Sequence, residues 1–119
     1  MTPAELGDFA MGFPEVTEEQ PFGPGAYVYK VAGKMFAVVE PDAEPPRVEM
    51  KCDPGLALHL RAEHDAVGPG YHLNKRHWNT VLLDGSIPAD RIEEMVEHSY
   101  ERVVAGLPKA VRERLAEAR

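Results

Sequence analysis

The chain has 119 residues, of which 44% are hydrophobic, and its formal net charge at pH 7 is -7. This length suits one compact domain over residues 1–119, which can bury roughly two-thirds of its unfolded surface without a disulfide or a structural metal. The net charge disfavours general attraction to phosphate, so a nucleic-acid site would have to be local. No apolar run approaches the roughly 20 residues that span a bilayer, and the N-terminus lacks the features of a signal peptide.

The N-terminal region predicts a short helix followed by a strand or loop. Thr2 and Pro3 are a typical N-cap and first helical residue, and Leu6 begins an apolar helical spacing. The segment TEEQPFGPG at 17–25 predicts a short strand or loop that ends in a Gly-Pro-Gly turn.

Three strands are predicted next. Segments 26–31 and 34–40 are rich in aromatic and β-branched residues, and the two residues between them, Ala32 and Gly33, have the length of a hairpin turn. In 47–52 the residue types alternate, which predicts a half-buried strand. The residues expected to face the core are Val48, Met50 and Cys52, and those expected to face away are Arg47, Glu49 and Lys51. The thiol of Cys52 is therefore expected to be buried and inert, and a lone cysteine favours a reducing, cytoplasmic setting.

The second half predicts three helices and one more strand. Asp53-Pro54 begins a helix in which Leu56 and Leu60 stack on one face and which fades near residue 65. VGPGY at 67–71 is typical of a turn, and 77–83 predicts a strand. Helical periodicity then runs over 88–107 and resumes in 108–119. This order differs from a regular βαβ alternation and predicts an α+β fold with a mainly antiparallel sheet.

The run GYHLNKRHWNTVLL at 70–83 contains no acidic residue. Residues 1–50 carry nine acids and three bases, whereas residues 51–119 carry eleven acids and ten bases. Lysine and arginine contact phosphate oxygens, and histidine and asparagine can donate hydrogen bonds to a nucleic acid. The candidate nucleic-acid-binding residues are His72, Asn74, Lys75, Arg76, His77, Lys51 and Arg112.

A structural interpretation of the same residues stays open. Trp78 can stack on a base, but a large aromatic residue at the start of a strand is more often a core anchor. Bases on a loop are usually just solvated, and the acids between the C-terminal bases indicate a salt-bridged solvent face. Acids also surround the bases of the strands in 26–52.

No pattern predicts an enzyme, a metal or a cofactor. His98 and Ser99 are adjacent on a helix and point about 100° apart, so the histidine cannot readily serve the serine as a base. His59 and His64 lie five apart on one helix, which does not place both rings on one face, and no phosphate-binding loop is present. A meeting of His72 and His77 across a hairpin is a minor alternative. We expect a protein without catalytic residues.

Five blocks of the sequence, in order, resemble the MmcQ/YjbR family of small bacterial proteins. The blocks are FPEVTEEQPFG, KMFA, MKCDP, GYHLNKRHWNTVLLDGSIP and HSYERVVAGLPK, and they cover about residues 13–115. The resemblance implies an α+β domain with an antiparallel sheet and helices packed on one face, similar to type III secretion chaperones and frataxin-like folds.

The same resemblance implies DNA binding, through a proposed arrangement of two β-hairpin wings. A fold does not fix a function, so this implication is a hypothesis. The alternative is a protein-interaction or chaperone-like adaptor module that binds no nucleic acid. An acidic surface suits a basic or unfolded protein partner. Oligomeric state is left open.

Overall fold

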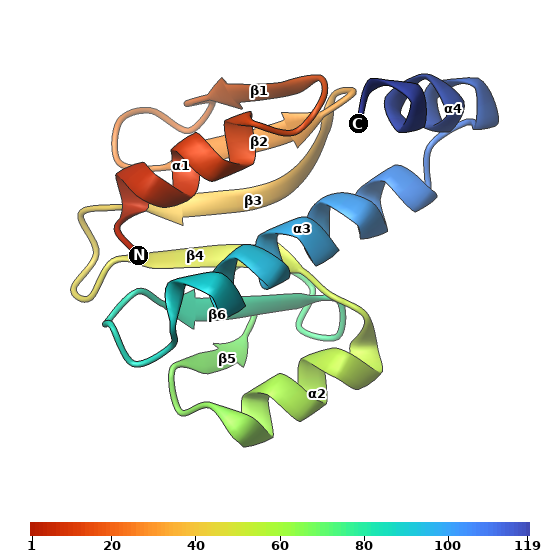
Figure 1. The fold of residues 1–119 in the computed structure, drawn as a ribbon. Coiled ribbons are helices and arrows are strands. Elements are labelled where there is room, and N and C mark those ends of the chain that lie inside the picture. The colour runs from red at the N-terminus through yellow and green to blue at the C-terminus, as the bar shows by residue number, and fades with distance from the viewer.

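A six-stranded antiparallel sheet forms the centre of the structure, a computed structural model that describes residues 1–119 (Figure 1). Its strand order is β1-β2-β3-β4-β6-β5, and every neighbouring pair is antiparallel. The strands are β1 (Val16–Glu19), β2 (Tyr27–Val31), β3 (Lys34–Glu40), β4 (Arg47–Lys51), β5 (Val67–Pro69) and β6 (Trp78–Leu82). The predicted α+β class with a mainly antiparallel sheet is confirmed.

Four helices accompany the sheet: α1 (Pro3–Met11), α2 (Pro54–Glu63), α3 (Ala89–Ala105) and α4 (Lys109–Ala118). Both predicted N-caps, Thr2 and Asp53, form. The hydroxyl of Thr2 accepts a hydrogen bond of 3.1 Å from the backbone N–H of Glu5, and Oδ2 of Asp53 accepts one of 3.0 Å from Leu56. These bonds satisfy backbone donors that a helix start otherwise leaves free.

The turn between β2 and β3 has the predicted hairpin geometry. Ala32 has φ of 49° and Gly33 has φ of 80°, so both central residues lie in the left-handed region. This pair of positive φ values matches the right-handed twist of the flanking strands, and Gly33 adopts its value without steric cost.

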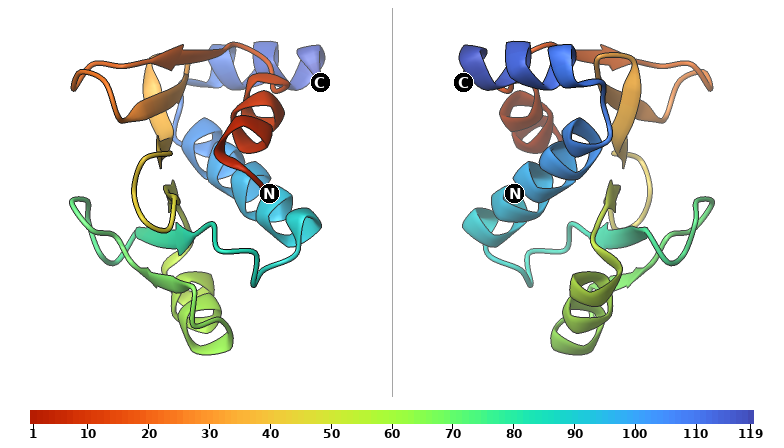
Figure 2. Two further views of the ribbon diagram at one scale, coloured as in Figure 1. Left: turned by 90° about the vertical axis from the view of Figure 1, so that its left-hand side faces the viewer. Right: turned by 90° about the vertical axis from the view of Figure 1, so that its right-hand side faces the viewer.

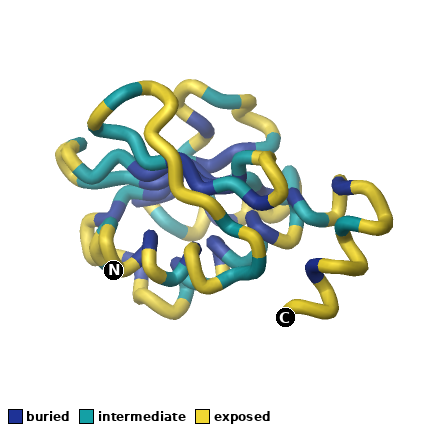
Figure 3. Tube along the Cα trace, turned by 90° about the horizontal axis from the view of Figure 1, so that it is seen from above, coloured by how far each residue is buried: buried dark blue, intermediate teal, exposed yellow.

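The main core lies between the sheet and the helices. Figure 2 shows α1 and α3 on one side of the sheet, with α4 beyond them. Residues from all four helices join one apolar cluster with the strands, including Leu6, Leu60, Tyr100 and Leu115. Figure 3 shows that buried positions gather along the strands, whereas α4 and the loops are mostly exposed. The predicted packing of helices on one face is confirmed.

The other face of the sheet is covered by loops. A row of register partners crosses it from β2 to β6: Val28, Val38, Glu49 and Thr80. The two valines of this row are buried, at 1% and 7% exposure, but they lie outside the main apolar cluster. Figure 2 shows the β1–β2 loop and the β5–β6 loop projecting from this side of the sheet, which we call the open face.

Three predictions about local structure were wrong. Residues 67–69 form the edge strand β5 and pair with β6, where the sequence predicted only a turn. Glu49 was expected in solvent but is 3% exposed, because loops cover the open face. Leu56 was expected to pack beside Leu60, yet it is 37% exposed, and Ala57 takes the buried position.

Candidate nucleic-acid interface

The β5–β6 loop, residues 70–77, carries most of the candidate residues. It turns back against the end of β4, where Lys51 is the register partner of Trp78 and the backbone N–H of Cys52 donates a 2.8 Å hydrogen bond to the carbonyl oxygen of His77. This register places Lys51, which is one of the candidate nucleic-acid-binding residues, beside the loop. We call loop 70–77 together with Lys51 and Arg61 the basic edge.

Arg61, which the sequence did not single out, ties α2 to this loop. Its Nε donates a 2.7 Å hydrogen bond to Oδ1 of Asn79, and its Nη2 donates to the carbonyl oxygens of Lys75 and Trp78. A base in the last turn of a helix usually interacts with the helix's own carbonyls. No sequence pattern therefore pointed from Arg61 to the loop.

Two candidate side chains serve the loop's own structure. Oδ1 of Asn74 accepts hydrogen bonds of 2.9 Å from the N–H of Arg76 and 3.2 Å from the N–H of His77, which is a common way for asparagine to close a turn. The ammonium of Lys75 donates a 2.8 Å hydrogen bond to the carbonyl oxygen of Gly70. The side chain of Arg76 is exposed and makes no such bond within the protein.

The positive charges at the basic edge are not neutralised by ion pairs. Of the 13 Lys and Arg side chains, seven pair with carboxylates, namely Lys30, Arg47, Arg91, Arg102, Lys109, Arg114 and Arg119. The six without such a pair are Lys34, Lys51, Arg61, Lys75, Arg76 and Arg112. Four of these six belong to the basic edge, so uncompensated positive charge is concentrated there in an acidic protein.

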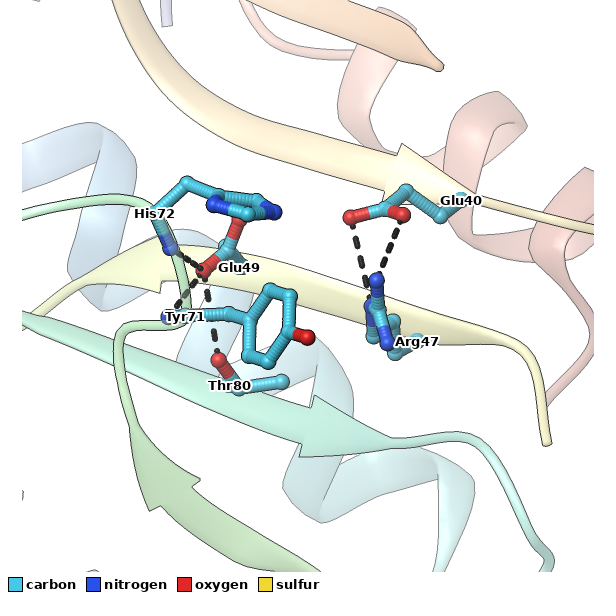
Figure 4. A network of polar contacts seen from close by, with 6 residues as sticks. All are labelled: Glu40, Arg47, Glu49, Tyr71, His72 and Thr80. Atoms are coloured by element: carbon cyan, nitrogen blue, oxygen red, sulfur yellow. Dashed lines mark hydrogen bonds and ion pairs between the residues drawn. The ribbon is translucent and has the colours of Figure 1, made fainter. Parts of the chain in front are cut away.

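Figure 4 shows how the other end of the loop is anchored on the open face. Oε1 of the buried Glu49 accepts hydrogen bonds from the backbone N–H groups of Tyr71, at 2.5 Å, and His72, at 3.4 Å, and from the hydroxyl of Thr80, at 3.3 Å. The ring of Tyr71 also lies under the guanidinium of Arg47, 4.7 Å from the ring centroid. Glu49 therefore fixes the start of the loop.

His72 lies away from the other candidate residues of the loop. Its ring packs edge-on against Tyr71, with 4.3 Å between ring centroids, and it lines a cavity on the open face together with Leu73 and Glu49. His77, by contrast, lies at the end of the loop next to Lys51. The two histidines thus occupy opposite ends of the loop.

Arg112 lies apart from the basic edge. It is on α4 and lines a groove between α3 and α4 with Glu101 and Arg119. Figures 1 and 2 place α4 at the opposite end of the molecule from β5 and α2. The structure therefore brings six of the seven candidates to loop 70–77 and its neighbouring strand, and it leaves Arg112 on the helical side.

Trp78 is 8% exposed, which confirms that its ring is buried rather than free to stack on a base. It lies outside the main apolar cluster, and its Cβ is 3.0 Å from where a Cβ on Gly70 would stand. The loop can pass over the tryptophan at this distance because residue 70 has no side chain. Trp78 therefore packs against loop 70–77 and supports its position.

The residues considered for catalysis have structural partners. Ser99 is fully buried, and its hydroxyl donates to the carbonyl oxygen of Phe36 at 2.6 Å and accepts from the N–H of Lys51 at 2.8 Å. Nε2 of His98 accepts a 3.1 Å hydrogen bond from the N–H of Asp53. Cys52 is 4% exposed, as predicted, and burial raises the pKa of its thiol to about 11.

The chain holds no group of three or more His, Cys, Asp or Glu side chains placed to bind one metal ion. None of its helices is both long enough and apolar enough to cross a membrane.

Fold and site together define a small α+β domain that has helices on one sheet face and loops, one of them basic, on the other. Residues 11–102 match the family model of YjbR, and the chain belongs to this family. The resemblance drawn from the five sequence blocks is confirmed.

Relatives and solved structures agree with this assignment. The uncharacterised protein YjbR of Escherichia coli K12 is 38% identical over 117 residues, which cover 98% of this chain and 99% of the relative. The uncharacterised protein YbdF of Escherichia coli O157:H7 is 32% identical over 106 residues, which cover 89% of this chain and 87% of the relative. A crystal structure of a Deinococcus radiodurans protein with a DUF419 domain superimposes with a TM-score of 0.90 at 36% identity, covering 97% of this chain and 88% of that one.

Proposed function

We propose that this protein is a non-enzymatic, cytoplasmic nucleic-acid-binding protein that contacts DNA through the basic edge. The observation that carries the proposal is the concentration there of four of the six basic side chains that have no carboxylate partner. In a protein of net charge -7, a local cluster of this kind confines contact with a polyanion to one edge.

The side chains of the edge divide into two roles. Arg76 is exposed, and Lys51 is half-buried, so their charged groups can meet phosphate oxygens directly. Arg61 and Lys75 hold the loop through hydrogen bonds and add positive potential behind it. Because the acidic remainder of the protein repels DNA, binding is expected to be weak and strongly dependent on salt.

The test is a titration of fluorescently labelled duplex and single-stranded DNA at several salt concentrations. With two or three phosphates engaged, the slope of log K against log salt should be about -2 to -3. Arg76→Ala should reduce the magnitude of this slope by about 1, and the double substitution of Lys75 and Arg76 by alanine should remove most of the binding.

Arg112→Ala is the matched control. It removes one unpaired arginine from α4, so it changes the net charge by the same amount as Arg76→Ala but leaves the basic edge intact. Equal losses in the two variants would mean that overall charge, and not this edge, governs binding. Absence of binding at tens of micromolar protein would overturn the proposal.

Protein interaction is the second candidate function. Three large apolar or aromatic side chains are strongly exposed: Phe22 at 74%, Leu58 at 65% and Tyr71 at 58%. Aromatic side chains such as those of Phe22 and Tyr71 are enriched in protein interfaces. If neither duplex nor single-stranded DNA binds, substitutions of these three exposed residues would test for contact with a protein partner.

A further inference from the structure

A cavity of about 390 Å³ opens on the open face of the sheet, between the β1–β2 loop and loop 70–77. Apolar side chains from both loops and from β3 form most of its wall: Phe22, Ala26, Met35, Val38 and Leu73. Its polar groups are Glu40, Glu49 and His72. Figure 2 shows the two loops projecting on the same side of the sheet, away from α1 and α3. A volume of this size is typical of sites for small molecules.

Glu49 brings an uncompensated negative charge to this cavity. It is 3% exposed, yet no Lys, Arg or His side chain forms an ion pair with it. All three of its hydrogen bonds reach Oε1, and Oε2 accepts none from the protein. Burial of a carboxylate without a cation is costly, so a buried carboxylate is normally paired.

The second acid of the cavity, Glu40, is already neutralised. Its two carboxylate oxygens accept hydrogen bonds of 3.2 Å and 2.8 Å from Nε and Nη2 of Arg47, which is a bidentate pair (Figure 4). Arg47 is held in place by the ring of Tyr71. The charge that remains in the cavity is therefore that of Glu49 alone, with His72 as the only titratable base in the wall.

We propose that this cavity binds a small organic cation, an amine with an aromatic or branched apolar body. The ammonium would donate a hydrogen bond to Oε2 of Glu49, and the apolar body would lie against Val38, Met35 and Leu73. Charge-assisted hydrogen bonds of this kind are about twice as strong as neutral ones. The body would also cover part of Phe22, which is 74% exposed. The cavity shares His72 and Leu73 with loop 70–77, but it uses none of the four unpaired bases on which the DNA proposal rests, Lys51, Arg61, Lys75 and Arg76.

The experiment compares three indole compounds that differ mainly in charge: tryptamine, which is cationic, tryptophol, which is neutral, and indole-3-acetate, which is anionic. Each is titrated into the intact protein, labelled with 15N, at pH 7.5, and backbone amide shifts are followed by NMR. Tryptamine should bind with a Kd of about 1 mM or tighter. The shifts should gather at 20–26, at β3 and at 70–73.

Glu49→Gln tests the charge, because glutamine has nearly the same shape and keeps an oxygen that can accept the loop's hydrogen bonds. The substitution should raise the Kd of tryptamine at least tenfold and leave the Kd of tryptophol nearly unchanged. Glu113→Gln on α4 is the matched control, since this exposed glutamate is remote from the cavity, and it should bind tryptamine as the unmodified protein does. If Glu49→Gln fails to fold, Ala26→Phe fills the cavity from the loop and should abolish tryptamine binding.

Three results would overturn the proposal. The first is that tryptophol or indole-3-acetate binds as tightly as tryptamine. The second is that the folded Glu49→Gln or Ala26→Phe variant keeps the original Kd for tryptamine. The third is that amide shifts are absent at 10 mM tryptamine or lie outside the cavity. Arg76→Ala should leave tryptamine binding intact. This last variant separates the cavity from the DNA contact, so each idea can fail without the other.

Discussion

The guanidinium of Arg61 donates a 2.7 Å hydrogen bond to Oδ1 of Asn79, and this contact joins the last turn of α2 to β6. Asn79 is 3% exposed, so its amide depends on partners within the protein. Because Arg61 also donates to carbonyl oxygens of Lys75 and Trp78, one side chain holds a helix, a strand and a loop together.

We predict that Arg61→Ala lowers the free energy of unfolding by about 1–3 kcal/mol, because it leaves the buried amide oxygen of Asn79 and the carbonyl oxygen of Lys75 without a donor. Urea denaturation followed by tryptophan fluorescence measures the change. Arg91→Ala is the control, since the ion pair of Arg91 with Glu63 is 3.6 Å long and exposed, and its loss should cost less than about 0.5 kcal/mol. Equal effects in the two variants would contradict this role of Arg61.

The sequence predicted the strands and helices well where one face of an element meets the main core. Val48, Met50 and Cys52 are buried as their alternation indicates. The same rule failed for Glu49, because alternation assumes that the second face of a strand meets solvent. Here the loops at residues 20–26 and 70–77 cover that face, and tertiary packing sets the position of both loops.

The candidate site was predicted in part for a similar reason. The acid-free run around Lys75 and Arg76 is visible in the sequence. The position of Trp78 at the start of a predicted strand also indicated that it is buried. The roles of Arg61 and Glu49 were not visible, because both residues act on a loop more than ten positions away along the chain. Spacing within one element carries no information about such contacts.

Trp78 provides a second prediction. Large-to-small substitutions of buried aromatic residues cost about 3–5 kcal/mol, so Trp78→Ala should lower stability by this amount. Since Trp78 is the only tryptophan, the denaturation should be followed by circular dichroism. Phe22→Ala is the control, because Phe22 is 74% exposed and its removal should change stability by about 0.5 kcal/mol or less.

A denaturation midpoint that does not move in Trp78→Ala would mean that the tryptophan does not anchor the fold. A loss of stability together with amide shift changes confined to 70–77 would show that it supports mainly the loop. The burial of Trp78 on the open face, outside the main cluster, makes this local effect the expected one.

Cys52 gives a third prediction, on pH dependence. Burial raises the pKa of its thiol from 9.0 to about 11, so the folded protein disfavours the thiolate more than the unfolded chain does. The stabilisation from keeping this thiol neutral is complete below pH 9, and it is lost as pH rises towards 11. The native thiol should also react with a disulfide reagent at pH 8 at least about 100 times more slowly than the thiol in urea.

Unfolding midpoints of the unmodified protein and of Cys52→Ala, measured at pH 8, 9.5 and 10.5, test this linkage. The decline with pH should be smaller in Cys52→Ala. Burial also raises the pKa of Tyr29, but this residue is present in both proteins, so the difference between them isolates Cys52. Parallel declines, or fast labelling of the native thiol, would contradict the prediction.

The contact between Gly7 and Tyr29 gives the last prediction. Gly7 lies within α1, where alanine would normally be more stable by about 0.5–1 kcal/mol. A Cβ at this position would overlap the hydroxyl oxygen of Tyr29, which donates a 2.7 Å hydrogen bond to Glu18. Tyr29 is 3% exposed and its ring cannot easily move, so Gly7→Ala should destabilise the protein by about 1–3 kcal/mol.

Tyr29→Phe removes the hydroxyl and with it the closest obstacle. In this background Gly7→Ala should cost less than about 1 kcal/mol, so the two substitutions should be clearly non-additive in a double-mutant cycle measured by urea denaturation. The ring carbon that carried the hydroxyl stays 3.3 Å from the new Cβ, which is tight and explains why a small cost is still expected. Additive costs would mean that α1 shifts away from β2 to accept the methyl group, and that the Tyr29 hydroxyl does not fix the distance between helix and sheet.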